Sequence, residues 1–324
     1  MEFILPFQIP TYPFTISYRD KILLIGSCFS EEIGNKMKGL KLNVLQNPNG
    51  ILYDPLSISE ALVSYIDNKP VEESELFELH GLWHSWKYHS VFSGINKEDV
   101  LSQINRSQSE AHLFLQKANL LIITLGTSYQ YQLKKNNKPV ANCHKAPSSF
   151  FRKVLLSIEE TTFSLLEVLN KLKIFNPGLK IIFTISPVKH VKDGVIENNR
   201  SKARLIEAAH TLVKKKENVY YFPSYELVTD ILRDYRFYTN DLVHPNDTAI
   251  NFVFEKFCDF LLDDEGKKIM GIIKSVINAV NHRPFLKESE AHQKFIRAQL
   301  TNIHKMEKEY SFIDFSAEKK HFSE

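Results

Sequence analysis

The sequence predicts an α/β protein: a three-layer α/β/α sandwich around a five-stranded parallel sheet, followed by a helical C-terminal extension. Short runs of wholly apolar residues recur along the chain, as is typical of strands buried on both faces. Stretches with helical periodicity separate these runs, and helices of that kind connect parallel neighbours. The five expected strands are 22–25, 42–45, 120–125, 180–185 and 219–222.

The first expected strand leads into the most informative turn of the chain. Gly26 and Ser27 follow the apolar run, and a helix to about Leu40 opens directly afterwards, with Ser30 as its expected N-cap. Ligands of open α/β sheets bind at the carboxyl ends of the strands, and N–H groups at a helix start can hold a developing negative charge. Ser27 is therefore a candidate nucleophile; the alternative is a simple cap or turn residue.

The segments between the first and third strands are less uniform. Turn residues at 47–50 end the second strand, and we expect helices at 56–65 and 110–119. Between these helices, residues 69–108 form an irregular excursion, in which 77–86 could be a hairpin. A doubly wound sheet with the strand order 2-1-3-4-5 would bring the ends of the first three strands together.

The second half of the chain continues the same alternation. A polar loop at 134–150 precedes a long helical pattern at 151–175, which the Asn-Pro-Gly sequence at 176–178 ends. Amphipathic helices are expected at 201–217 and 247–262.

The strand–helix alternation stops near residue 263. We therefore expect one α/β domain at 1–262 and a charged, mostly helical extension at 263–324 that packs on this domain. Apolar residues at helical spacing in the extension, among them Ile269 and Val276, also allow an oligomerisation element. The oligomeric state stays open at this point.

Composition limits the class of partner. The 324 residues carry a net charge of +3, which is too balanced to indicate binding to nucleic acid or to a membrane surface. Three scattered Cys residues favour reduced thiols in a cytoplasm. Prolines interrupt the apolar N-terminal stretch, which has no basic leader, and no run reaches the length of a membrane span. We expect a cytoplasmic protein.

A carboxylate and an imidazole occur together late in the chain. Asp241 and His244 lie three residues apart before the last helix of the α/β domain, so the carboxylate can hold one ring nitrogen and leave the other as a base. A serine early in the chain with an Asp–His pair late in it is one of the orders that build a catalytic triad. The alternative for the pair alone is a local turn bond.

These residues carry a resemblance to a known group. Gly26-Ser27 after the first strand and Asp241-x-x-His244 before the last helix resemble the SGNH/GDSL hydrolase superfamily, whose fold is flavodoxin-like. The chain is more closely similar to the GSCFA-domain family, with Gly26-Ser27-Cys28-Phe29-Ser30 as the first motif. The similarity continues through residues 49–55, 124–127, 142–145, 186–190 and 241–245.

The resemblance implies a role for individual residues. Ser27 would be the nucleophile, His244 the general base and then acid, and Asp241 the residue that orients it. The N–H groups of Ser27 and Gly50 would form the oxyanion hole. The superfamily's Gly-x-Asn-Asp motif is absent: this chain has Gly126-Thr127-Ser128-Tyr129, so a third donor would come from Thr127, Ser128 or Asn142. The further substrate-binding candidates are Asn49, Ser128, Asn142, His144 and His190.

Other patterns in the sequence give weaker indications of a catalytic, metal or cofactor site. Cys28 could act as a thiol nucleophile, but between an apolar strand and Phe29 we expect it to pack. His80, His84 and His89 lack matching carboxylate spacing and lie among tryptophans, so we expect no metal site. Glycine-rich phosphate-binding motifs are absent, and we expect no cofactor.

Together these observations predict a serine hydrolase that acts on a small-molecule or carbohydrate ester, for example by removing an acetyl group. An acyltransferase would use the same three residues. A non-catalytic binding module is the third hypothesis, because the Asn of the oxyanion hole is missing.

Overall fold

The computed structural model describes residues 5–283, 285–286 and 288–323, and its centre is a five-stranded parallel sheet. The strands lie in the order β10-β9-β5-β1-β2, which confirms the expected doubly wound order. Polar side chains at the carboxyl ends of β1, β2 and β5 are thereby gathered at one edge. The strands are β1 (Lys21–Gly26), β2 (Asn43–Gln46), β5 (Leu120–Leu125), β9 (Lys180–Ile185) and β10 (Val219–Phe222).

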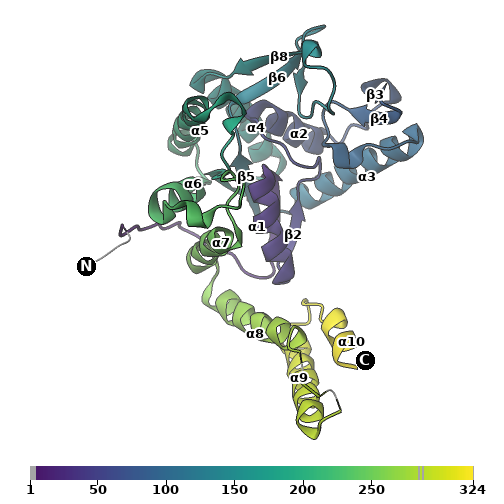
Figure 1. Cartoon of the computed structure of the whole chain (residues 1–324), viewed down its shortest axis with the longest axis vertical. Coiled ribbons are helices and arrows are strands. Elements are labelled where there is room, and N and C mark those ends of the chain that lie inside the picture. Colours follow the sequence, from purple (N-terminus) through teal and green to yellow (C-terminus); the bar gives the residue numbers. More distant parts are fainter. Residues whose placement is uncertain (1–4, 284, 287, 324) are drawn as a thin grey trace.

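Helices cover both faces of the sheet, so the three-layer sandwich is confirmed (Figure 1). Successive side chains of β1 alternate between the layers: Ile22 and Leu24 belong to one buried cluster, and Leu23 and Ile25 to the other. The first layer contains α1 (Cys28–Gly39) and α7 (Asp247–Leu261). The second contains α2 (Pro55–Asp67), α3 (Lys97–Gln116), α4 (Ile158–Phe175) and α5 (Val195–Lys215).

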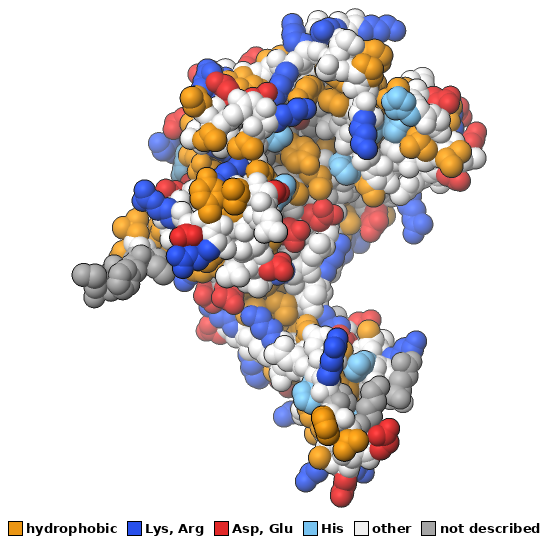
Figure 2. All heavy atoms as spheres, in the orientation of Figure 1, with side chains coloured by type: hydrophobic (Ala, Val, Ile, Leu, Met, Phe, Trp, Pro, Cys, Tyr) orange, Lys and Arg blue, Asp and Glu red, His pale blue; other side chains and the backbone are white. Residues whose placement is uncertain are grey.

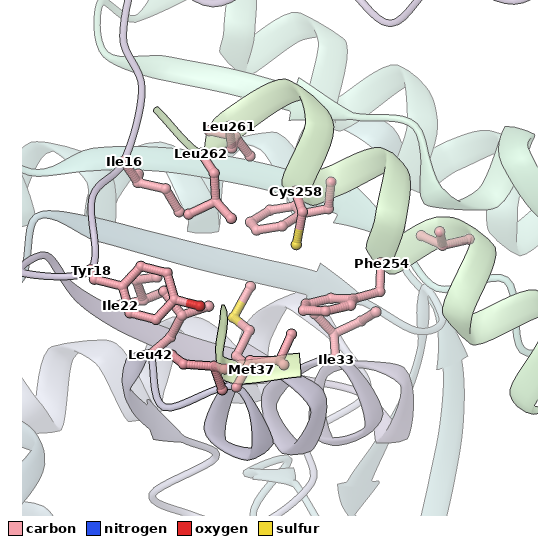
Figure 3. Close-up of a cluster of buried hydrophobic side chains, with 14 of the residues drawn as sticks. Ile16, Tyr18, Ile22, Ile33, Met37, Leu42, Phe254, Cys258, Leu261 and Leu262 are labelled. Atoms are coloured by element: carbon pink, nitrogen blue, oxygen red, sulfur yellow. The ribbon is translucent and has the colours of Figure 1, made fainter. Parts of the chain in front are cut away.

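In the core of the first layer, α1 and α7 pack against β1 (Figure 3). Met37 of α1 is completely buried, and Ile33 one turn earlier faces Phe254 of α7 in this cluster. Tyr18 and Leu42 cover the side near the start of β1 and the end of α1. Because α1 begins at the candidate nucleophile and α7 follows the Asp–His turn, this core sets the relative position of the two chemical elements.

Two small antiparallel sheets lie outside the main sheet. The expected hairpin is present as β3 (Leu76–Leu79) and β4 (Leu82–Ser85). The second sheet is β6 (Tyr129–Leu133), β7 (Pro139–Val140) and β8 (Phe151–Leu155).

The expectation of one helix across 151–175 is wrong at its start, where the chain forms β8. The apolar residues of this stretch fit a strand period as well as a helical one. Ser157 then begins α4 with a capping box: its hydroxyl accepts from the Glu160 N–H, and Glu160 accepts from the Ser157 N–H. The helix therefore starts at the cap and not at Phe151.

Three helix starts also differ from expectation. The helix α3 begins at Lys97, well before residue 110, because Asn96 caps it. The helix α5 begins at Val195 and not at residue 201. The N-cap of α1 is Ser27 and not Ser30, whose hydroxyl is buried against that of Thr124.

The tail is helical, as expected, and consists of α8 (Asp264–Val280), α9 (Glu290–Glu309) and α10 (Ser316–Ser323). Figure 1 shows α8 leading away from the sheet, with α9 and α10 folded back beside it. The Lys41 ammonium donates to the Asp314 carbonyl at 2.7 Å and pairs with Glu318 at 2.9 Å, which connects the tail to the end of α1. No helix in the described part of the chain is long and apolar enough to cross a membrane.

The close approach of β1 and β5 predicts that position 26 tolerates no residue larger than glycine. Its φ is +139°, and an added Cβ would lie 2.1 Å from the Thr124 carbonyl oxygen. We expect Gly26→Ala to lower the free energy of unfolding by at least about 3 kcal/mol, since strain and overpacking add. Urea unfolding with Gly39→Ala as the control checks this, because a Cβ at Gly39 meets no atom within 4 Å. Equal stability of Gly26→Ala and wild type would contradict the close approach.

Candidate active site

Ser27 sits in an N-cap position without acting as a cap. Its backbone is extended at φ −68° and ψ 174°, immediately before α1, but its side chain makes no capping hydrogen bond. The hydroxyl is buried and has no partner within the described residues. An N-cap serine normally accepts a hydrogen bond from the first turn, and buried polar groups are normally paired. The Ser27 hydroxyl is therefore left available for another partner.

The Asp241 carboxylate organises the turn before α7. Its Oδ1 accepts from the Thr239 hydroxyl at 2.6 Å and from the N–H groups of Val243 and His244 at 2.8 and 3.0 Å. Its Oδ2 is 2.6 Å from His244 Nδ1. The Thr239 hydroxyl and the His244 N–H groups hold the pKa of Asp241 well below its usual range. The ionised carboxylate thus accepts from Nδ1–H and leaves Nε2 as the basic nitrogen.

The loop after β9 supports this turn. The Lys189 N–H donates to the Val243 carbonyl at 3.1 Å. The Lys189 ammonium lies 4.0 Å from the ring centroids of both Tyr235 and Tyr238, which precede the Asp–His turn. The backbone and the side chain of Lys189 therefore connect the loop after β9 to the segment that contains the Asp–His turn.

His244 and the start of α1 line the same cleft. A cavity of about 360 Å³ is bounded by Cys28 and Glu32 of α1 on one side and by Thr239 and His244 on the other. The space-filling view shows the molecule hollowed on the face that carries α1 and α7 (Figure 2). His244 and Cys28, the residue that follows Ser27, thus line one cavity. No hydrogen bond joins Ser27 to His244, and the Ser27 hydroxyl is buried.

The N–H groups expected at the oxyanion hole have backbone partners in this structure. Ser27 N–H donates to the Thr124 carbonyl at 3.2 Å, and Gly50 N–H donates to the Asn47 carbonyl at 2.7 Å. Thr127 N–H donates to the Tyr53 carbonyl at 3.0 Å. Their role as oxyanion donors stays a prediction, and it requires an exchange of these bonds for the substrate.

Asn47 is a residue that sequence reasoning missed. It follows β2, and its Oδ1 accepts from the Gly26 N–H at 2.9 Å, next to Ser27. Its side-chain NH₂ group is buried and donates to no described residue. Asn47 belongs to the turn at 47–50, so its place after the second strand was a usable signal.

The side chains that follow β5 are directed towards α5. The hydroxyls of Thr127 and Ser128 lie 3.0 and 3.1 Å from the Ser201 hydroxyl, and Ser128 N–H donates to the same oxygen at 2.8 Å. Both residues are buried. In this structure Thr127 and Ser128 therefore connect the segment after β5 to α5.

Asn49 and Asn142 also have protein partners. Asn49 accepts from the Tyr65 hydroxyl at 2.6 Å and donates to the Lys87 carbonyl at 3.1 Å. The Asn142 side chain accepts from the His144 N–H at 2.8 Å and shapes a turn. These contacts fix the walls around the sheet edge, and a substrate contact of either residue stays a prediction.

His144 was expected in a polar loop, but it is buried. Its Nε2 is 2.8 Å from the Ser85 carbonyl, and its ring centroid lies 4.5 Å from that of His84. Burial lowers its pKa to about 4. His144 therefore connects its loop to the β3–β4 hairpin.

His190 lies nearer to the sheet edge. Its N–H donates to Asn198 Oδ1 at 2.7 Å, and its ring centroid is 6.4 Å from that of Tyr53. Burial lowers the pKa of His190, and the charges of Lys153 and Lys202 add to this effect. A substrate contact of His190 stays a prediction.

The part of the chain that the structure describes contains no group of three or more His, Cys, Asp and Glu side chains placed to hold a metal ion. Both ring nitrogens of His84 have protein partners, at the Ser93 hydroxyl and the Leu79 carbonyl.

Two family models match parts of this chain. A model described as "GSCFA family" matches residues 21–257, and one described as "GSCFA domain protein, C-terminal domain" matches residues 273–324. No curated protein sequence matches.

Two solved structures are similar. A carbohydrate esterase family 3 protein from Talaromyces cellulolyticus has 10% identity and a TM-score of 0.38 over 79% of this chain and 99% of that one. An acetyl xylan esterase from Butyrivibrio proteoclasticus has 10% identity and a TM-score of 0.36 over 78% and 64%.

The buried state of His144 predicts a pH dependence of stability. With its pKa at about 4 in the folded protein and near 6.5 unfolded, the unfolded chain binds more protons between these values. Stability should therefore fall as the pH drops from about 6.5 to 4, and His144→Gln should show a smaller fall. Thermal unfolding from pH 7 to 4.5 measures the difference, with the exposed His80 changed to Gln as the control. Parallel curves for wild type and His144→Gln would refute it.

Proposed function

The chain belongs to the GSCFA family, and we propose that it is a serine hydrolase that cleaves esters with Ser27, His244 and Asp241. One observation carries the proposal: an Asp-held imidazole and the start of α1 line one cleft, and a buried, unbonded serine hydroxyl precedes that helix. An N-cap serine that caps nothing has no structural reason to keep its hydroxyl.

The proposed reaction begins with rotation of the Ser27 hydroxyl from its buried position into the cleft. Its oxygen attacks the carbonyl carbon of the ester while His244 Nε2 takes its proton. The bond to the alcohol breaks, and His244 returns the proton to the leaving oxygen. Water then attacks the acyl group, His244 takes a proton from it, and the acid leaves as Ser27 is restored. Catalytic hydrogen bonds are often long without substrate.

The start of α1 supplies part of the charge stabilisation in this proposal. Ser27 lies at the positive end of the helix dipole, where negative charge is favoured. Its N–H bond to Thr124 is long at 3.2 Å, so this donor can turn to an oxyanion at small cost. The unpaired NH₂ group of Asn47 is a second donor at the same edge.

We propose a carbohydrate ester, such as an acetylated sugar, as the substrate class. Tyr53 and His190 offer ring surfaces with polar tips at the sheet edge, which suits a sugar carrying an acyl group. An acyltransferase would use the same residues with an alcohol in place of water.

A binding module without turnover is the second candidate. The observation that favours it is the internal bonding of the Ser27, Gly50 and Thr127 N–H groups. Removal of one oxyanion donor typically costs about 2.7–4 kcal/mol of transition-state stabilisation.

A serine-directed fluorophosphonate probe tests the nucleophile. We expect wild type to be labelled and to hydrolyse p-nitrophenyl acetate, and Ser27→Ala to lose both, because the attacking oxygen is removed. The matched control is Cys28→Ala, which changes the adjacent residue in the same cleft and should keep both activities. Undiminished labelling and hydrolysis by Ser27→Ala would remove Ser27 from the mechanism, and no labelling of folded wild type would favour the binding module.

The role of Asp241 is tested by Asp241→Asn. The amide cannot accept from Nδ1–H as the carboxylate does, so His244 is left in the wrong tautomer. We expect kcat to fall by about 10³–10⁴-fold with a small change in KM. Asp247→Asn, at the first position of α7 in the same cleft, is the control and should stay within about twofold. Equal losses in the two variants would contradict the orienting role.

A further inference from the structure

Lys202 is a buried lysine that pairs with no carboxylate among the described residues. It lies in α5 at 1% exposure, and its ammonium donates to the Gly126 carbonyl at 2.6 Å and the Ser186 carbonyl at 2.7 Å. These carbonyls directly follow β5 and β9, two neighbouring strands of the sheet. No salt bridge to Lys202 forms within the described residues.

The contacts of Lys202 reach the candidate nucleophile through one residue. A Cβ added to Gly126 would lie 3.3 Å from the Ser27 Cβ, so the Gly126 backbone passes directly against the Ser27 side chain. Lys202 holds the carbonyl of this same residue. The preceding residue, Ser201, holds Thr127 and Ser128. Two consecutive residues of α5 thus fix the whole segment that faces Ser27.

The charge of Lys202 also acts at the start of α1. Burial raises the pKa of the Cys28 thiol, and the Lys202 charge acts on that thiol in the opposite direction. Cys28 lines the cleft that contains His244. The Lys202 side chain therefore lies within electrostatic reach of Cys28, the first residue of α1.

Burial of a cation against neutral carbonyls is unfavourable for folding. Desolvation of the ammonium is costly, and an apolar side chain of similar length avoids this cost. Apolar packing alone therefore does not account for a lysine at this position, where the ammonium satisfies the Gly126 and Ser186 carbonyls.

We propose that Lys202 is a positioning residue of the active site, which fixes the Gly126 and Ser186 carbonyls and places positive charge behind Ser27. This inference rests on the proposed hydrolase function. The chain lacks a side-chain amide after Gly126, and in the proposal the Lys202 amine, which is charged below its pKa of about 7, stabilises the oxyanion electrostatically. Lys202 makes no contact with the substrate in this arrangement.

The burial of Lys202 also predicts a pH dependence of folding stability, which can be measured independently of catalysis. Burial lowers the pKa of Lys202 to about 7, against 10.5 in the unfolded chain. Between these values the unfolded chain holds a proton that the folded protein has lost, so stability rises with pH. A variant without the amine lacks this rise.

The experiment compares Lys202→Met with Lys214→Met, an exposed lysine in the last turn of the same helix. It measures kcat and KM for p-nitrophenyl acetate, the rate of fluorophosphonate labelling, and thermal unfolding, each from pH 6 to 10. We expect Lys202→Met to lose the rise of stability with pH, because the titrating amine is removed. At pH 6, where the wild-type amine is protonated, we also expect kcat and labelling rate to fall at least about tenfold, with KM within twofold, and we expect this difference from wild type to shrink as the pH rises above 7. Lys214→Met should behave as wild type.

Wild-type kcat, labelling rate and pH profile in Lys202→Met would overturn the inference. If Lys202→Met does not fold, Lys202→Gln replaces it, because the Gln amide can donate to both carbonyls without a charge. A lowered kcat of Lys202→Gln at wild-type stability supports the inference. A wild-type kcat of this variant overturns it. Failure of the hydrolase proposal is recognised separately, since Ser27→Ala then keeps its activity whatever Lys202→Met does.

Discussion

The close approach of β1 and β5 at Gly26 is the constraint on which the site depends. The Gly26 backbone lies so near the Thr124 carbonyl that no side chain fits, and the chain turns there directly into α1. Ser27 is consequently buried between the end of β1 and Gly126 after β5, where its hydroxyl is shielded from water.

The side chains of the proposed base and the proposed nucleophile are oriented to different degrees. The Asp241 carboxylate receives four hydrogen bonds from its own turn, and Lys189 fastens that turn to the loop after β9. His244 is thus oriented before any substrate arrives, whereas the Ser27 hydroxyl is unbonded. In our account, substrate binding draws this hydroxyl towards an imidazole that is already in place.

Sequence patterns predicted the sheet and its strand order, because residues buried on both faces leave wholly apolar runs such as 22–25. They also placed Asp241 beside His244, a contact within one turn. Contacts between residues far apart in the sequence could not be predicted. His144, for example, is buried where its ring contacts the carbonyl of Ser85, 59 positions away. The backbone acceptors of Lys202 leave no trace in side-chain patterns, although its spacing from Leu205 and Ala209 put it on the buried face of α5.

A crystal structure of the protein after reaction with a small fluorophosphonate tests the central claim most directly. The account predicts a covalent bond from the Ser27 hydroxyl oxygen to phosphorus, with His244 Nε2 within about 3.2 Å of an adduct oxygen. Phosphorus bound to another residue, or a Ser27 adduct that His244 cannot reach, would contradict the claim that these two side chains share one proton.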